Sequence, residues 1–218
     1  MRGGLPAIVV AYAVSAITGV IASLTNHRRL LWFAKPLTTA LLFGVVGPPR
    51  SGFARLIDVG IAFSLVGDVA LLVPAKQAFL IGLGIFLGAH LAYIAAFLAV
   101  AGADAISAPT AVAGAFMAGV TALLLRRLWP RTAGMRAPLV VYGVALAGMV
   151  TAAVAAASTP AAPLSPVVPI GAALFYVGDA SLAVDKFDRR IQGAPLLTLG
   201  VYWLGQLAIA LGARFASS

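Results

Sequence analysis

The sequence predicts an all-α polytopic membrane protein, a bundle of eight transmembrane helices. Hydrophobic residues make up 62% of the chain and charged residues only 10%, and the mean hydropathy is +1.05. A water-soluble core cannot bury that much apolar surface. Because a helix needs about 20 apolar residues to cross the hydrocarbon layer, eight spans and short loops use the whole chain. We therefore expect a single transmembrane domain over residues 1–218.

Eight apolar runs, bounded by charged residues, proline or glycine, supply the predicted spans. The first run follows Arg2 and could be mistaken for a signal peptide. It is about 20 residues long and seven similar runs follow it, so we interpret it as a span. The predicted spans cover 5–25, 30–47, 54–73, 77–101, 107–125, 137–157, 166–184 and 195–213.

The basic residues predict the orientation, because positively charged loops stay on the cytoplasmic side. Ten lie in the loops after the first, third, fifth and seventh spans, and four lie on the opposite side. We therefore expect both termini outside the cytoplasm. The excess of arginine over lysine suggests a bacterial source and hence the bacterial cytoplasmic membrane. The ten are Arg28, Arg29, Lys76, Arg126, Arg127, Arg131, Arg136, Lys186, Arg189 and Arg190.

Charge and cysteine content exclude several classes of function. The net charge of +9 does not indicate nucleic-acid binding, because the bases lie in interhelical loops rather than on one amphipathic face. Cysteine is absent, which excludes disulfides, thiolate metal sites and cysteine nucleophiles.

Four ionisable residues inside predicted spans are the candidate site: Lys35, Asp68, His90 and Asp179. A charge at such depth costs at least ~2.5 kcal/mol on insertion scales, so it normally faces a protein interior or a wet cavity. Lys35, Asp68 and Asp179 each lie about five residues from the cytoplasmic end of their spans, which places them at one level ~8 Å deep. We expect them to line one cavity that opens to the cytoplasmic side, with His90 nearer the midplane.

Polar side chains at helical spacing extend these faces. Thr38 and Thr39 follow Lys35 by three and four residues. Ser64 precedes Asp68 by four, and the last span carries a polar pair of its own. Pro36 is expected to kink the second span beside Lys35. The candidate supporting residues are Thr38, Ser64, Tyr93, Tyr176, Tyr202 and Gln206.

Structural roles are alternatives for two of these groups. Lys35 could snorkel to the interface or neutralise one aspartate as a structural ion pair, and His90 could be a satisfied interior hydrogen bonder. The pair Asp68 and Asp179 is harder to explain structurally, because one lysine cannot neutralise two buried carboxylates. We therefore expect one of the two to hold its proton at neutral pH.

An internal repeat joins the two aspartates. The sequences AFSLVGDVAL at 62–71 and ALFYVGDASL at 173–182 share VGDxxL with an offset of 111 residues, about half the chain. The match fits either a weak duplication into 1–104 and 105–218 or chance similarity between two apolar helices.

The same residues resemble the YhhN family of membrane proteins, whose characterised members are lysoplasmalogenases. The matching elements lie in the family's order over spans two to eight, and spans five and six carry none. Gly178 precedes Asp179 where the family more often has serine. The elements are KPLTT at 35–39, AFSLVGDVALLVP at 62–74, FLIGLGIFLGAHLAYIAAF at 79–97, GAALFYVGDASLA at 171–183 and YWLGQ at 202–206.

The resemblance implies hydrolysis of the vinyl ether bond of a lysophospholipid, releasing a fatty aldehyde and glycerophospho-choline or -ethanolamine, without a cofactor or a metal. This reaction needs a protonated acid and an anion, which two carboxyls in different surroundings supply. We hypothesise that one of Asp68 and Asp179 donates the proton and the other stabilises the cation. Lys35 would keep one aspartate ionised or bind phosphate, and His90 and Tyr93 would position water or donate hydrogen bonds.

Three alternatives remain from the sequence. His90, Asp68 and Asp179 could bind Zn²⁺ in a metal-dependent lipid hydrolase, although the second histidine, His27, is in a loop. Lys35 and the aspartates could instead form the site of a proton-coupled transporter. A non-catalytic protein that binds membrane lysolipid is the third.

Overall fold

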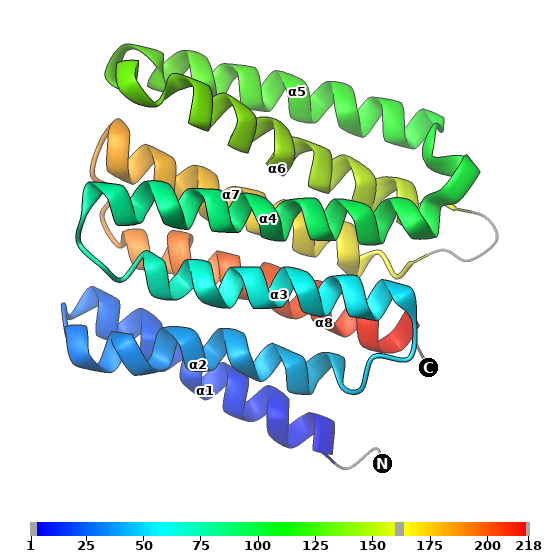
Figure 1. Cartoon of the computed structure of the whole chain (residues 1–218), viewed down its shortest axis with the longest axis horizontal. Helices are drawn as coiled ribbons and strands as arrows, with labels where there is room; N and C mark the ends of the chain where they lie inside the picture. Colours follow the sequence, from blue (N-terminus) through cyan, green and yellow to red (C-terminus); the bar gives the residue numbers. More distant parts are fainter. Residues whose placement is uncertain (1–3, 160–163, 217–218) are drawn as a thin grey trace.

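A computed structural model describes residues 4–159 and 164–216, and these residues contain eight α-helices packed as one bundle (Figure 1). Seven of them are long and apolar enough to cross a membrane. The prediction of an all-α membrane bundle is confirmed. The helices are α1 (Gly4–Leu24), α2 (Arg28–Val46), α3 (Gly52–Ala70), α4 (Lys76–Ala101), α5 (Ala108–Leu128), α6 (Arg136–Ala157), α7 (Val167–Phe187) and α8 (Tyr202–Ala216).

The helix outside the group of seven is α3, although its 19 residues match α2 in length. It carries Arg55, Asp58 and Asp68, three charges in one helix. Asp68 is buried where α3 packs against its neighbours in the bundle, whereas Arg55 is exposed near the start of the helix. The predicted third span therefore stands apart by charges spread over its whole length, and one of them, Asp68, belongs to the candidate site.

Most chain neighbours form antiparallel pairs, but α4 packs on α6 instead of α5, and α2 packs on α8 from the far end of the chain (Figure 1). Helix α7 approaches α8 closely at Gly205, where a Cβ atom would lie 2.6 Å from the carbonyl oxygen of Gly171. Small residues at such crossings bring membrane helices into contact. This contact holds Asp179 and Tyr202, on neighbouring helices, near each other.

A π-helical segment, η4 (Leu196–Val201), precedes α8. Pro195 stands at its start and supplies no backbone N–H. A π turn holds one more residue than an α turn, so it rotates the following residues relative to a continuous α-helix. The segment thereby sets the direction in which Tyr202 projects.

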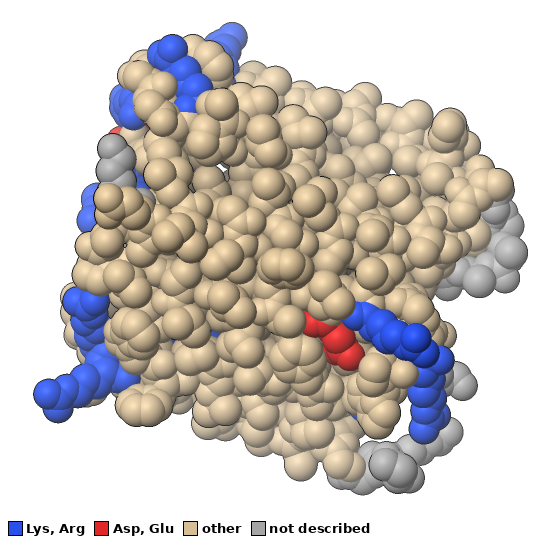
Figure 2. All heavy atoms as spheres, in the orientation of Figure 1, with Lys and Arg blue, Asp and Glu red and all other residues tan. Residues whose placement is uncertain are grey.

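The loops after α1, α3, α5 and α7 lie together at the left end of the bundle in Figure 1. Lys and Arg side chains gather along that same edge in Figure 2, with a smaller group beside an acidic residue at the lower right. We call the left end the basic end.

Candidate active site

A cavity of about 690 Å³ lies at the basic end, and all eight helices contribute residues to its wall. Leucine is the most frequent residue in its wall, and Lys35, Asp68, Asp179 and Tyr202 also line it. Its outer part reaches Arg190 in the loop after α7. The structure thus brings the two aspartates of the VGDxxL elements and the lysine into one apolar chamber.

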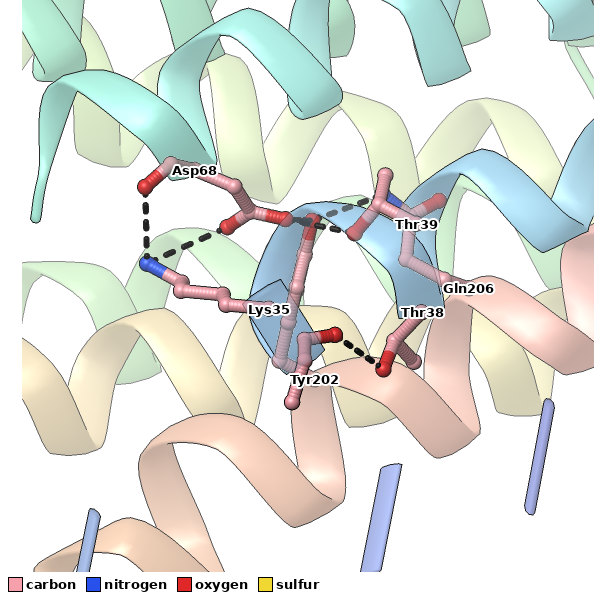
Figure 3. Close-up of polar contacts among 7 residues, drawn as sticks. Lys35, Thr38, Thr39, Asp68, Tyr202 and Gln206 are labelled. Carbon is pink, nitrogen blue, oxygen red and sulfur yellow. Dashed lines mark hydrogen bonds and ion pairs between the residues drawn. The ribbon is translucent and has the colours of Figure 1, made fainter. Parts of the chain in front are cut away.

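Asp68 is surrounded by hydrogen-bond donors (Figure 3). Lys35 Nζ lies 3.3 Å from Oδ1, the Thr39 hydroxyl donates to Oδ2 at 2.5 Å, and the Tyr202 hydroxyl donates to Oδ2 at 3.2 Å. Lys35 also donates to the backbone carbonyl of Asp68 at 3.3 Å. The Asp68 side chain is only 1% exposed. A cation and two hydroxyl donors stabilise an ionised carboxylate in such a buried place.

A buried chain of hydrogen bonds orients Tyr202. The Tyr93 hydroxyl donates to Gln206 Oε1 at 2.6 Å, and Gln206 Nε2 donates to the Tyr202 oxygen at 3.2 Å. Tyr202 already accepts from the amide, so its own proton is free to point at Asp68. Tyr93 and Gln206, two predicted supporting residues, therefore stand behind Tyr202 rather than in the cavity wall.

Asp179 has different surroundings. The Tyr142 hydroxyl donates a short hydrogen bond to Oδ2, and His90 Nε2 lies 3.8 Å from the same oxygen. Among the described residues no Lys or Arg forms an ion pair with Asp179. Of the two aspartates in the cavity wall, Asp179 is therefore the one without a Lys or Arg partner among the described residues.

His90 is fully buried and does not line the cavity. Ring edges of Phe175 and Tyr142 pack on it, with centroids 4.9 and 5.0 Å away. Neither ring nitrogen makes a hydrogen bond of ordinary geometry in the described part of the chain. His90 therefore does not line the cavity together with Lys35 and the two aspartates, as the sequence led us to expect. It lies behind Asp179, close to that carboxyl.

Three predicted supporting residues lie beside the cavity. Thr38 donates to the Ala34 carbonyl at 2.7 Å and shares a hydrogen bond with Ser15 of α1 at 2.8 Å. Consecutive residues on a helix point about 100° apart, so Thr39 and not Thr38 meets Asp68. The Tyr176 hydroxyl pairs with Thr121 of α5 at 3.0 Å. Ser64 is fully buried one turn from Asp68.

Tyr142 of α6 is a residue that the motifs did not single out. It lies in the cavity wall and holds Asp179, yet its helix carries none of the matching elements. The signal available in the sequence was a tyrosine in the apolar run VVYGV, because a buried phenol normally has a polar partner.

Gly178 explains how closely α7 meets the start of α8. A Cβ atom at this position would lie 2.9 Å from the Tyr202 Cβ and 3.0 Å from its backbone nitrogen. A serine here would push Tyr202 away from its present place. The glycine in place of the more usual serine therefore affects the packing beside Tyr202, and it leaves the Asp179 carboxyl unchanged.

The described residues contain no group of three or more His, Asp or Glu side chains arranged to hold a metal ion. The combination of His90, Asp68 and Asp179 is divided, because Asp68 is held by Lys35 and Thr39 while His90 faces Asp179 alone. The residues present do not fit the zinc site considered from the sequence.

Comparisons with known proteins identify relatives over most of the chain. Lysoplasmalogenase TMEM86B of Homo sapiens is 31% identical over 191 residues, which are 85% of this chain and 77% of the relative. Lysoplasmalogenase of Mycobacterium tuberculosis is 30% identical over 188 residues, 84% of this chain and 68% of the relative. Lysoplasmalogenase TMEM86A of Homo sapiens is 30% identical over 166 residues, 73% and 65% of the two chains.

No solved structure matches the chain. The family comparison matches residues 30–213, which include every motif from Lys35 to Gln206 and both aspartates. The chain therefore belongs to the YhhN family.

Proposed function

We propose that this protein is a membrane-embedded hydrolase that cleaves the vinyl ether bond of lysoplasmalogen-type lysolipids. The observation that carries the proposal is the pair of aspartates in one apolar cavity, one with a cation and one without. The relatives named lysoplasmalogenase support the same reaction. The products would be a fatty aldehyde and a glycerophospho-choline or -ethanolamine.

The unequal surroundings of the two aspartates support one division of the two roles. Asp68 accepts from Thr39 and Tyr202 and pairs with Lys35, so it acts as the carboxylate. Asp179 lies in a leucine-rich wall without a cation, so it acts as the protonated acid. The other assignment would leave Lys35 as an uncompensated buried charge.

The reaction begins when Asp179 transfers its proton to the vinyl carbon β to the ether oxygen. The π electrons form the new C–H bond, and the ether oxygen stabilises the resulting cation as an oxocarbenium ion. Asp68 stabilises this cation and takes a proton from the attacking water, which adds to the cationic carbon and gives a hemiacetal. Collapse of the hemiacetal returns its hydroxyl proton to Asp179, while Asp68 protonates the departing glycerol oxygen.

The remaining polar residues act through the two acids. Lys35 keeps Asp68 ionised rather than binding phosphate, since its side chain is only 7% exposed and engaged with that residue. Tyr142 holds the acid in place, and His90 stabilises the Asp179 anion after proton transfer. Tyr93 and Gln206 hold the Tyr202 hydroxyl toward Asp68.

The Lys and Arg side chains at the basic end support an orientation in which the cavity faces the cytoplasm and both termini lie outside. The membrane would be the bacterial cytoplasmic membrane. A single-chain lipid could then enter from the inner leaflet. The chain has no cysteine, so single cysteines can be introduced without background. Membrane-impermeant thiol reagents applied to intact cells should label a cysteine in the loop after α2 and spare one in the loop after α5; the reverse pattern would invert the orientation.

The proposal is tested by incubating purified protein with 1-alkenyl, 1-alkyl and 1-acyl lysolipids that carry the same head group. Mass analysis should find aldehyde and glycerophospho-head group from the 1-alkenyl lipid alone. Free fatty acid from the 1-acyl lipid would indicate an esterase. Uptake into proteoliposomes without turnover would indicate the transporter, and lipid recovered intact would indicate a binding protein.

A further inference from the structure

The mouth of the cavity holds a lysine, Lys186, that packs on an aromatic ring. Lys186 Nζ lies 4.0 Å from the centroid of the Phe79 ring, and Phe79 meets Phe187 edge to face at 5.8 Å. All three residues line the cavity. No carboxylate forms an ion pair with Lys186 in the described residues. A cation–π contact uses one side of the ammonium group and leaves N–H donors for an anion.

The acid next to Lys186 is already engaged. Asp185 accepts from Arg190 Nη1 at 3.1 Å and from the Ile191 backbone nitrogen at 2.8 Å. These two contacts fix the turn that follows α7 and neutralise Asp185. Lys186 is therefore the cation at the mouth that is left to meet an external anion.

Lys186 and Asp179 share one face of α7. Residues seven apart complete nearly two turns, and Ala183, between them on the same stripe, also lines the cavity. The two Cα positions are separated along the helix by seven residues, ~10 Å. One straight element thus carries the proposed acid at the inner end of the cavity and a free cation at its mouth.

That separation matches a glycerophospholipid. In a 1-alkenyl lysolipid, seven bonds connect the phosphorus to the vinyl carbon that takes the proton. At about 1.2 Å per bond in an extended chain, the two atoms are ~8 Å apart. A phosphate bound at Lys186 would therefore place that carbon beside Asp179. The flexible lysine side chain makes up the small difference between the two lengths.

The geometry points to a phosphate-binding subsite at Lys186 that fixes which bond of a lysophospholipid reaches Asp179. This inference rests on the proposed function. It assigns the recognition of the substrate's phosphate to one residue at the end of α7. The apolar rings of Phe79 and Phe187 hold the lysine at the mouth, while the leucine-lined wall receives the hydrocarbon chain.

The test compares two substrates, 1-alkenyl-glycerophosphocholine and 1-alkenylglycerol, which lacks the phosphate. Lys186→Met should raise KM for the phospholipid roughly three- to tenfold with kcat unchanged, and Lys186→Arg should restore it. KM for 1-alkenylglycerol should stay the same. Arg189→Met is the matched control, because it removes one positive charge three residues further along the chain, at a residue outside the cavity wall. An equal change of KM for both substrates in Lys186→Met would overturn the subsite.

A binding measurement separates this inference from the proposed hydrolysis. A 1-alkyl lysophosphocholine has no vinyl group and cannot react, so its Kd, read from tryptophan fluorescence, reports the subsite alone. Lys186→Met should weaken its binding by the same factor and leave 1-alkylglycerol unaffected. Unchanged affinity would refute the subsite even if hydrolysis occurs; weakened affinity without any aldehyde from the alkenyl lipid would keep the subsite and refute the hydrolase.

Discussion

The two VGDxxL elements are alike in sequence and opposite in surroundings. On α3, Asp68 is held by Lys35, Thr39 and Tyr202, which come from α2 and α8. On α7, Asp179 meets Tyr142 and has His90 nearby. The same six-residue pattern therefore carries an ion pair at one copy and an unpaired carboxyl at the other. The difference shows that packed neighbours, and not the motif, determine the surroundings of each acid.

The largest effect is expected from Asp179→Asn, which removes the proton donor and leaves the volume unchanged. General acid catalysis contributes about 10²–10⁴ to a rate, so kcat should fall by about that factor. Thermal stability should change little, because no buried charge loses a partner. Asp58→Asn, an acid of α3 outside the cavity wall, is the control and should retain the wild-type rate. An equal loss of rate in Asp58→Asn would show that the effect of Asp179→Asn is not specific to the cavity.

At the VGDxxL element of α3, the ion pair between Lys35 and Asp68 is expected to contribute most to stability. Lys35→Met or Asp68→Asn alone breaks a buried pair, so each should lower the free energy of unfolding by about 3 kcal/mol. The double variant leaves no uncompensated charge and should regain most of that loss, while remaining inactive because the carboxylate is gone. Unfolding in detergent with added denaturant measures this cycle. Strict additivity of the two single effects would contradict a coupled pair.

A smaller effect is expected from Tyr142→Phe, which removes the hydrogen bond to Asp179. The loss of one positioning hydrogen bond, about 1.5 kcal/mol, should lower kcat about tenfold. Tyr176→Phe on α7 breaks a bond to Thr121 instead, so its effect on kcat should be clearly smaller. Aldehyde release under saturating substrate measures both. Similar rates for the two variants would remove Tyr142 from the site.

The smallest effect is expected outside the spans, at Asp188. The hydrogen bond from Arg127, at 2.6 Å, holds the pKa of the Asp188 carboxyl below its usual value, and Arg131 adds a second contact. A lowered pKa in the folded state adds stability above the ordinary carboxyl range and loses it as pH falls through the lowered value. Asp188→Asn should therefore lower Tm slightly at pH 7 and not in acid, with activity unchanged. A larger loss in acid than at pH 7 would reverse the sign.

The sequence predicted the architecture well because membrane insertion makes apolar length a strong signal. It also identified Lys35, Asp68 and Asp179, since charges inside spans are few. Which neighbour touches each acid depends on helix rotation and on contacts between distant helices. The contact of Thr39 and not Thr38 with Asp68 follows from the rotation of α2, and the contact of Tyr142 with Asp179 follows from the packing of α6 against α7. Neither is visible in a linear pattern.

The most direct test of the account follows the hydrogen that Asp179 is proposed to deliver. Wild-type protein should hydrolyse a 1-alkenyl lysolipid in D₂O to an aldehyde that carries one deuterium on the carbon next to the carbonyl. Unlabelled aldehyde incubated under the same conditions corrects for exchange. Wild-type aldehyde without deuterium, or labelled aldehyde from Asp179→Asn at the wild-type rate, would contradict proton transfer from this carboxyl to carbon.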